Sequence, residues 1–133
     1  MLQLETTYFK RNEEGCSQDP HIFDDKIRVA TITYIYYIDI KDIVRIQSIS
    51  NYSKLFFMNG QTLIVSKVLA HFDELLAGRH FSRIHRTHLV NLHYMEKYVR
   101  GKLPKIGMCN NDMLPVSRRN KKMVQEKMLL LSM

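Results

Sequence analysis

From about residue 26 to residue 65 the chain carries runs of apolar and β-branched residues of the kind typical of β-strands. Residues 27–40 are dense in Ile, Val, Thr and Tyr, and Ile43–Ile49 predicts a further strand. Two more apolar runs, Leu55–Met58 and Thr62–Val65, flank the pair Asn59-Gly60. Because Asn-Gly tolerates the positive φ angles of a tight turn, these two runs are predicted to form a hairpin.

The period of the pattern changes over residues 67–77. Apolar side chains there recur at i, i+1, i+4, i+7 and i+8, which places them on one face of a helix: Val68, Leu69, Phe72, Leu75 and Leu76. Ser66 is the expected N-cap, and Gly78 is suited to the C-terminal stop.

Short strands are predicted to resume after this helix, at Phe81–His85, His88–Leu92, Tyr94–Val99, Lys105–Cys109 and Met113–Val116. The last two are expected to form a hairpin around residues 110–112. Pro104 and Gly107 predict that its first arm is short or lies at a sheet edge.

A C-terminal helix is predicted from Arg118, because Val124, Met128 and Leu131 recur at helical spacing and Ser117 can cap its start. The sequence therefore predicts a mainly β domain of small antiparallel sheets, stacked in an elongated arrangement, with one short internal helix and one C-terminal helix.

At 133 residues the chain is long enough for one domain with a core of its own. Residues 1–25 are polar and interrupted by Gly and Pro, which predicts a linker or frayed leader. The domain is expected over 26–129, with a short tail at 130–133.

No apolar run approaches the roughly 18–20 residues of a membrane span, and the N-terminus lacks a signal peptide, so we expect a cytoplasmic protein. Cys16 and Cys109 form no disulfide framework and are expected to stay reduced.

The charge of the chain is unevenly distributed. Residues 1–66 carry 7 basic and 8 acidic side chains, a net charge of −1, whereas residues 67–133 carry 13 and 5, a net charge of +8. A basic half of this kind is typical of a polyanion-binding surface, although a merely basic soluble protein would show it as well.

The densest cluster is RHFSRIHRTH, residues 79–88, with three arginines and three histidines. Phe81 and Ile84 are its expected buried residues, but the pattern leaves open which face Arg83 and His85 occupy. A solvated strand end is one interpretation. A metal site is disfavoured, because no carboxylate or thiolate lies within five residues of His85 or His88. Contact with phosphates or bases is favoured, since the planar fork of arginine matches both.

Two further segments are candidates for nucleic-acid contact. Four cations, Arg118, Arg119, Lys121 and Lys122, stand at the start of the C-terminal helix, where the helix dipole favours anions. An external phosphate bound at this helix start would explain them, whereas a tolerated charge run is the alternative. The polar loop around Asn51–Lys54 can also bond to bases or phosphates, as many loops can.

Motifs for catalysis are absent from the sequence: it has no nucleophile elbow, no GxGxxG and no phosphate-binding GxxxxGK[ST]. A histidine-based ribonuclease with His85 and His88 as acid and base is the one enzyme to consider. An RNA-binding β domain is a second alternative.

The order of these features resembles the LytTR domain, the DNA-binding output domain of AlgR/AgrA/LytR-type bacterial response regulators. The resemblance covers about residues 26–128 and is carried mainly by FSRIHRTHLVNL (81–92) and LPVSRR (114–119), in the right order and spacing. It implies a mainly β fold that binds double-stranded DNA through loops in successive major grooves, and thereby regulates transcription without catalysis, cofactor or metal.

The resemblance also implies which residues contact DNA. They come from the loop after the second strand, the turn within the RIHR block and the start of the C-terminal helix: Asn51, Tyr52, Ser53, Lys54, Arg83, His85, Arg86, Thr87, His88, Arg118, Arg119, Asn120, Lys121 and Lys122. Arg86 and Arg119 match base-reading positions. The family typically binds direct repeats, so two copies are expected on each site.

Family members usually carry an N-terminal receiver domain, for which residues 1–25 are too short. A receiver domain and a histidine kinase are therefore expected only if this chain is a fragment, and Asp24 and Asp25 are not a phosphorylation site. Among the histidines, we expect His85 to be half-buried and to orient its turn, and His88 to be more exposed. DNA would then raise the pKa of an interfacial histidine, and affinity would rise as the pH falls from about 8 to 6.

Overall fold

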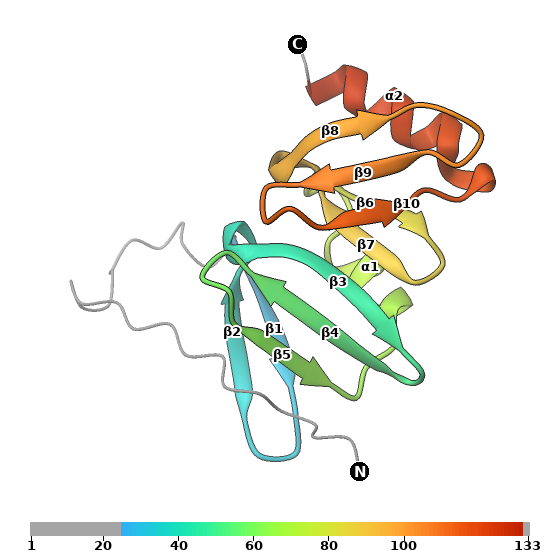
Figure 1. Cartoon of the computed structure of the whole chain (residues 1–133). Helices are drawn as coiled ribbons and strands as arrows, with labels where there is room; N and C mark the ends of the chain where they lie inside the picture. Colours follow the sequence, from blue (N-terminus) through green and yellow to red (C-terminus); the bar gives the residue numbers. More distant parts are fainter. Residues whose placement is uncertain (1–24, 132–133) are drawn as a thin grey trace.

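The computed structural model describes residues 25–131, which form three antiparallel sheets and two α-helices (Figure 1). The mainly β architecture, with one internal and one C-terminal helix, confirms the prediction from sequence. Residues 1–24, which include Cys16 and Asp24, and residues 132–133 lie outside the described part of the chain.

The first sheet is a two-stranded hairpin of β1 (Lys26–Ala30) and β2 (Ile35–Asp39). The sequence indicated one continuous strand over 27–40, and this expectation is wrong. The backbone turns between the two strands, where the N–H of Tyr34 donates to Thr31 Oγ1 at 2.9 Å and the N–H of Thr31 donates to the Tyr34 carbonyl at 2.7 Å. A threonine side chain thus closes a turn that contains neither glycine nor proline.

The second sheet has five strands in the order β5-β4-β3-β7-β6. Their bounds are Ile43–Ile49 for β3, Tyr52–Phe57 for β4, Thr62–Val65 for β5, Phe81–His85 for β6 and His88–Asn91 for β7. The predicted hairpin of β4 and β5 is confirmed, but only Gly60 in its turn has a positive φ, at 87°. Asn59 contributes its side chain instead, since its Oδ1 accepts from the Gln61 N–H at 2.9 Å.

The third sheet has the order β10-β9-β8, built from β8 (Met95–Val99), β9 (Lys105–Met108) and β10 (Met113–Pro115). Strand β9 is short, as predicted, but it is the central strand, so the alternative of an edge position is wrong. Gly107 permits this place: a Cβ there would lie 2.9 Å from Cγ of Lys97, whose aliphatic stem crosses the strand.

Both predicted helices form, with different starts from those expected. Helix α1 spans Leu69–Leu75 and has Val68, not Ser66, at its N-cap, without a capping side chain; Gly78 follows it with φ of 80°. Before helix α2 (Lys121–Leu131), the 3₁₀ turn η4 (Arg118–Asn120) begins after Ser117. Ser117 occupies the cap position, but its carbonyl, not its hydroxyl, accepts the Asn120 N–H.

The central sheet has an apolar cluster on each face. One cluster joins β1–β5, α1 and residues such as Phe81 and Leu89, while the other joins the third sheet and α2 to Ile84 and Val90. Neighbouring residues of one strand therefore enter different clusters, as Leu89 and Val90 do at 0% exposure. In β6, Phe81 and Ile84 enter opposite clusters, so these two side chains lie on opposite faces of the sheet.

The single cysteine of the described residues, Cys109, is a free thiol next to Met58, with 3.8 Å between the two sulfur atoms. Burial, together with the nearby carboxylate of Glu96, raises the pKa of the Cys109 thiol, so it is protonated at neutral pH.

The two-cluster arrangement yields a stability prediction at Ile84, a fully buried residue of β6 in the cluster that also contains Val124 of α2. Ile84→Ala should reduce the free energy of unfolding by about 2–5 kcal/mol, because it leaves a cavity in the smaller cluster. The matched control is Leu130→Ala, at a residue 76% exposed, which should stay within about 0.5 kcal/mol of the parent protein. Urea denaturation measures both, and equal stabilities of the two variants would contradict the assignment.

Candidate nucleic-acid interface

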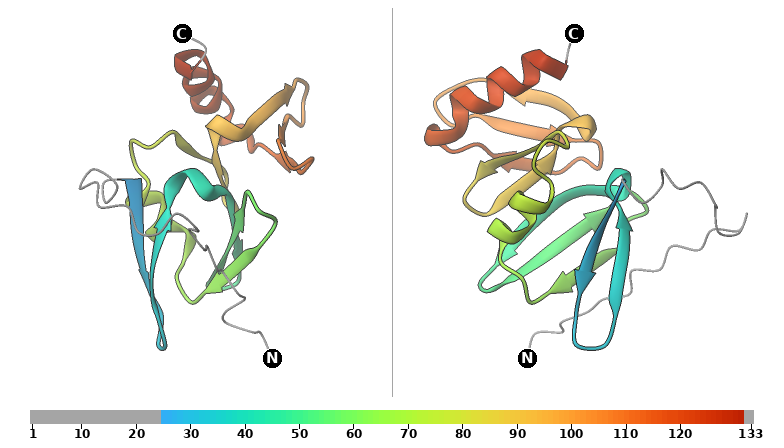
Figure 2. Two further views of the ribbon diagram at one scale, coloured as in Figure 1. Left: turned by 90° about the vertical axis from the view of Figure 1, so that its left-hand side faces the viewer. Right: turned by 180° about the vertical axis from the view of Figure 1, so that it is seen from behind.

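Three of the segments singled out in the sequence lie along one edge of the molecule (Figures 1 and 2). They are the β3–β4 turn (residues 50–51), the β6–β7 turn (residues 86–87) and η4. Backbone hydrogen bonds hold them side by side: the Ser48 N–H donates to the Thr87 carbonyl and the Ser117 N–H to the Ile84 carbonyl, both at 2.9 Å. Segments up to about 70 residues apart in sequence thus share one surface, here called the loop edge.

The β3–β4 turn is a tight two-residue connection. Ser50 adopts a left-handed conformation with φ of 54°, and Asn51 beside it is exposed. Along β4, Tyr52 and Lys54 are half-buried on one face, whereas Ser53 points into the core with 0% exposure. The Ser53 hydroxyl donates to the Lys67 carbonyl at 2.7 Å, so its hydrogen bond is made within the protein. The period-2 alternation of β4 explains why it differs from its neighbours.

The β6–β7 turn presents Arg86 to solvent and is supported from within. The Thr87 N–H donates to His85 Nδ1 at 3.2 Å, and Thr87 Oγ1 lies 2.9 Å from the same nitrogen. Nδ1 is therefore an acceptor, which assigns the proton of the neutral ring to Nε2. Arg83 also stabilises the turn, because its guanidinium donates a hydrogen bond to the Arg86 carbonyl at 2.7 Å. His85 thus has the half-buried, turn-orienting position expected of it.

His88 departs from expectation. Burial of the ring, followed by the charge of Arg45 and the neighbouring His85, lowers the pKa of His88 from about 6.5 to about 4. Its Nδ1 is buried and has no hydrogen-bond partner among residues 25–131. His85 and His88 are both half-buried, so burial alone does not separate them, but with this pKa the His88 ring of the free protein is neutral from pH 8 to 6.

Arg45 was not among the residues predicted from the sequence; it lies in β3 and is 7% exposed. Its Nε donates to Asp112 Oδ2 at 2.8 Å, its Nη1 donates to Gln47 Oε1 at 2.8 Å, and its Cζ lies 3.6 Å from the centroid of the Phe56 ring. The ion pair ties the β9–β10 hairpin to the central sheet. A cation between the apolar residues of β3 was a signal that a partner exists, but that partner is 67 residues away.

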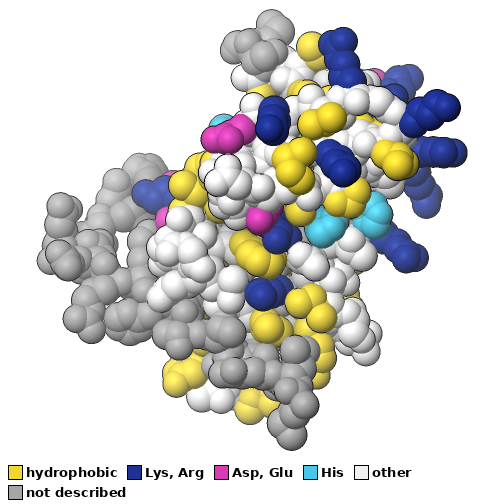
Figure 3. All heavy atoms as spheres, in the orientation of Figure 1, with side chains coloured by type: hydrophobic (Ala, Val, Ile, Leu, Met, Phe, Trp, Pro, Cys, Tyr) yellow, Lys and Arg dark blue, Asp and Glu magenta, His cyan; other side chains and the backbone are white. Residues whose placement is uncertain are grey.

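The start of α2 supplies the exposed cations of the loop edge: Arg118, Arg119, Lys121 and Lys122. None of the four forms a salt bridge with any residue of the described chain, and the first turn of α2 holds no acidic side chain. Asn120 beside them is half-buried. Figure 3 shows Lys and Arg side chains gathered along this side of the upper half of the molecule. The surface therefore has positive charge that nothing within residues 25–131 neutralises.

Other kinds of site find little support in the described segment. It contains no group of three or more His, Cys, Asp or Glu side chains placed to hold a metal ion. Neither of its helices has the length and apolar character that a membrane span requires.

Fold and loop edge together define a mainly β domain with a surface suited to polyanions. The sequence pattern of the LytTr DNA-binding domain matches residues 33–129, and the chain belongs to this family. It is thus a DNA-binding protein of transcription regulation. A similar fold occurs in the LytTr DNA-binding domain of a putative methyl-accepting/DNA response regulator from Bacillus cereus, with a TM-score of 0.66, 16% identity, and coverage of 77% of this chain and 95% of that chain. No curated protein matches the chain.

The lowered pKa of His88 predicts a pH dependence of stability. Between about pH 6.5 and 4 the unfolded chain binds a proton at His88 that the folded protein does not, so the free energy of unfolding should fall as the pH is lowered through this range. His88→Gln should make that decline shallower. Urea denaturation at several pH values, with NMR titration of the histidine rings, measures both effects. A His88 ring that titrates near 6.5 would contradict this interpretation.

Proposed function

We propose that the chain is a sequence-specific regulator that binds double-stranded DNA, with the turns of the loop edge entering successive major grooves. The observation that carries the proposal is the juxtaposition of three polar or basic segments on one edge, with cations that lack a protein partner among the described residues. Phosphates of a duplex would supply the missing countercharge.

We assign a role to each side chain of the loop edge from its exposure: reading bases, holding phosphates or positioning a turn. Asn51, Arg86 and Arg119 are exposed and carry the groups that read base edges, since amides match adenine and guanidinium forks match guanine. Lys54, Arg118, Lys121 and Lys122 hold phosphates, with Tyr52, Thr87 and Asn120 beside them. Arg83 and His85 position the β6–β7 turn through their hydrogen bonds to Arg86 and Thr87, and the half-buried His88 ring lies beside this turn.

The wider setting follows from the same proposal. The domain extends over residues 26–129, acts in the cytoplasm, catalyses no reaction, and binds direct repeats with two copies on each site. A receiver domain governed by a histidine kinase would belong to it if the chain is part of a longer regulator.

Selection of bound sequences from a random duplex library tests the proposed function. A recurring motif, repeated at a spacing of whole helical turns, is the expected result. Binding of a matched RNA duplex with equal affinity would favour the RNA-binding alternative. Turnover of nucleic acid that survives chelator controls would favour the nuclease.

The salt dependence of binding gives the first prediction for this surface. With at least six cationic contacts, log K should fall with log salt at a slope of about −4 to −6, at roughly 0.9 per phosphate. Fluorescence anisotropy with a labelled operator, from 50 to 300 mM salt, measures the slope. A slope near zero would show that the cations of the loop edge do not meet phosphates.

A second prediction separates base readers from phosphate holders. Arg86→Ala and Arg119→Ala should each lose about 1–3 kcal/mol on the selected sequence and little on a scrambled one. Lys121→Ala and Lys122→Ala should weaken binding to both sequences alike and flatten the salt slope. If all four variants behave identically, the division of roles is wrong.

A further inference from the structure

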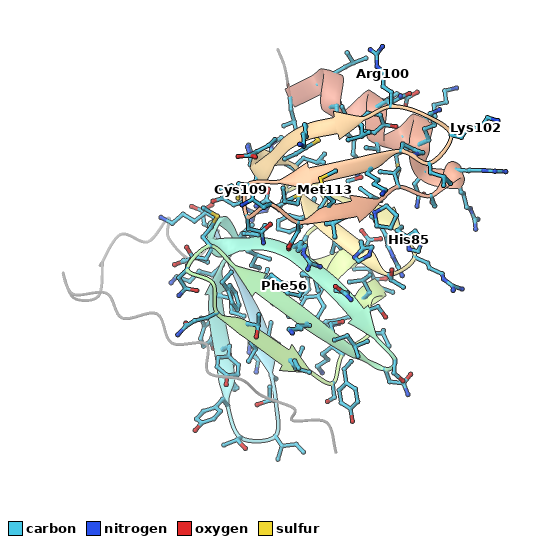
Figure 4. The ribbon with its side chains drawn as sticks, viewed as in Figure 1. Phe56, His85, Arg100, Lys102, Cys109 and Met113 are labelled. Atoms are coloured by element: carbon cyan, nitrogen blue, oxygen red, sulfur yellow. The ribbon has the colours of Figure 1, made fainter. Side chains whose placement is uncertain are left out.

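The loop between β8 and β9 lies on the same edge as the three segments described above, although no motif of the sequence drew attention to it. It runs Arg100-Gly101-Lys102-Leu103-Pro104 and is followed by Lys105, the first residue of β9. In Figure 1 and in the right-hand view of Figure 2 it lies on the same side of the molecule as the start of α2, and Figure 4 shows Arg100 and Lys102 directed away from the sheet.

Backbone contacts fix the base of this loop next to η4. The Val116 N–H donates to the Pro104 carbonyl at 2.9 Å, and Lys105 pairs with Val99 on one side and with Pro115 on the other. The start of β9, which follows the loop, and the segment that leads into η4 are therefore neighbours at the same end of the third sheet. The base of the loop is thus one backbone hydrogen bond away from the segment that leads to Arg118.

The chemistry of the loop favours a polyanion. Arg100, Lys102 and Lys105 are exposed, none forms a salt bridge with a residue among 25–131, and the segment from 97 to 105 contains no acidic residue. The tip is open: Gly101 has φ of 140°, with no atom within 4 Å of the place where a Cβ would stand, and Leu103 is 75% exposed. The loop therefore presents its cations on a protruding backbone that carries no carboxylate of its own between residues 97 and 105.

We propose that the β8–β9 loop is a fourth DNA-contacting element, which holds phosphates beyond the base-reading turns and lengthens the stretch of duplex that each copy covers. This inference rests on the proposed function. Its ligand is the phosphate backbone, because the Lys102 and Lys105 ammonium groups act as point charges that carry little base discrimination, and the guanidinium of Arg100 also matches phosphate oxygens.

The test compares two double variants of equal charge in the full chain. Arg100→Ala/Lys102→Ala should weaken binding to selected and scrambled duplexes by the same factor and reduce the magnitude of the salt slope by about 2, for two lost phosphate contacts. The control is Arg28→Ala/Lys41→Ala. It removes one exposed arginine and one exposed lysine from β1 and from the turn after β2, on the other side of Figure 1.

Hydroxyl-radical footprinting on the selected sequence shows where the protein protects the DNA backbone, and this position does not change merely because the protein has lost two positive charges. The loop variant should lose backbone protection at one end of each repeat and keep it elsewhere, while the control keeps the whole footprint. An unchanged slope and footprint in the loop variant would overturn this inference and leave the proposed function standing. Failure of the parent protein to select any duplex sequence would instead overturn the proposed function. Circular dichroism confirms that all variants are folded.

Discussion

The loop edge exists because three strands of the central sheet are buried on both faces. In β7, Leu89 enters the larger cluster and Val90 the smaller one, while the Asn91 side chain donates to the Ile43 carbonyl at 3.0 Å. When alternate side chains of a strand enter two different apolar clusters, the pairing register of that strand is fixed, since a shift by one residue would exchange the two sets of side chains. The β6–β7 turn is therefore held in a fixed position relative to both the β3–β4 turn and η4.

The Arg45–Asp112 ion pair adds a polar constraint to this apolar one. Removing a guanidinium from water is costly, and here the cost is offset by a carboxylate, an amide oxygen and an aromatic face. Since the Asp112 side chain is 34% exposed, the pair adds only modestly to stability. Its geometry matters more, because it fixes the β9–β10 hairpin on the sheet. Its positive charge also helps to keep His88 neutral.

The sequence was sufficient to predict the turns and helix ends that depend on residues close together in the chain. The Asn59-Gly60 hairpin and the Gly78 helix stop depend on the conformational freedom of one glycine each, and both were predictable. The turn at Thr31 was not, because its hydrogen bonds involve residue types that otherwise favour strands.

Features that depend on distant contacts were beyond the same reasoning. The partner of Arg45, the burial of the His88 ring and the adjacency of the β8–β9 loop to η4 each depend on how the sheets meet. The charge pattern thus located the basic half of the molecule, whereas only the fold separates Ser53, which faces the core, from Asn51, which faces solvent.

The lengths and internal hydrogen bonds of the loops fit the proposal that some of them read bases and another holds phosphates. The β3–β4 and β6–β7 connections have two residues each, and Arg83 and His85 hold the second one in place, so docking of these turns in the proposed complex would cost little conformational entropy. Reading a base edge requires placement to a fraction of an ångström, which such turns provide. The β8–β9 loop is longer and contains Gly101, and a lysine that holds a phosphate tolerates far more positional freedom. Short braced turns therefore suit base recognition, and the open loop suits the backbone.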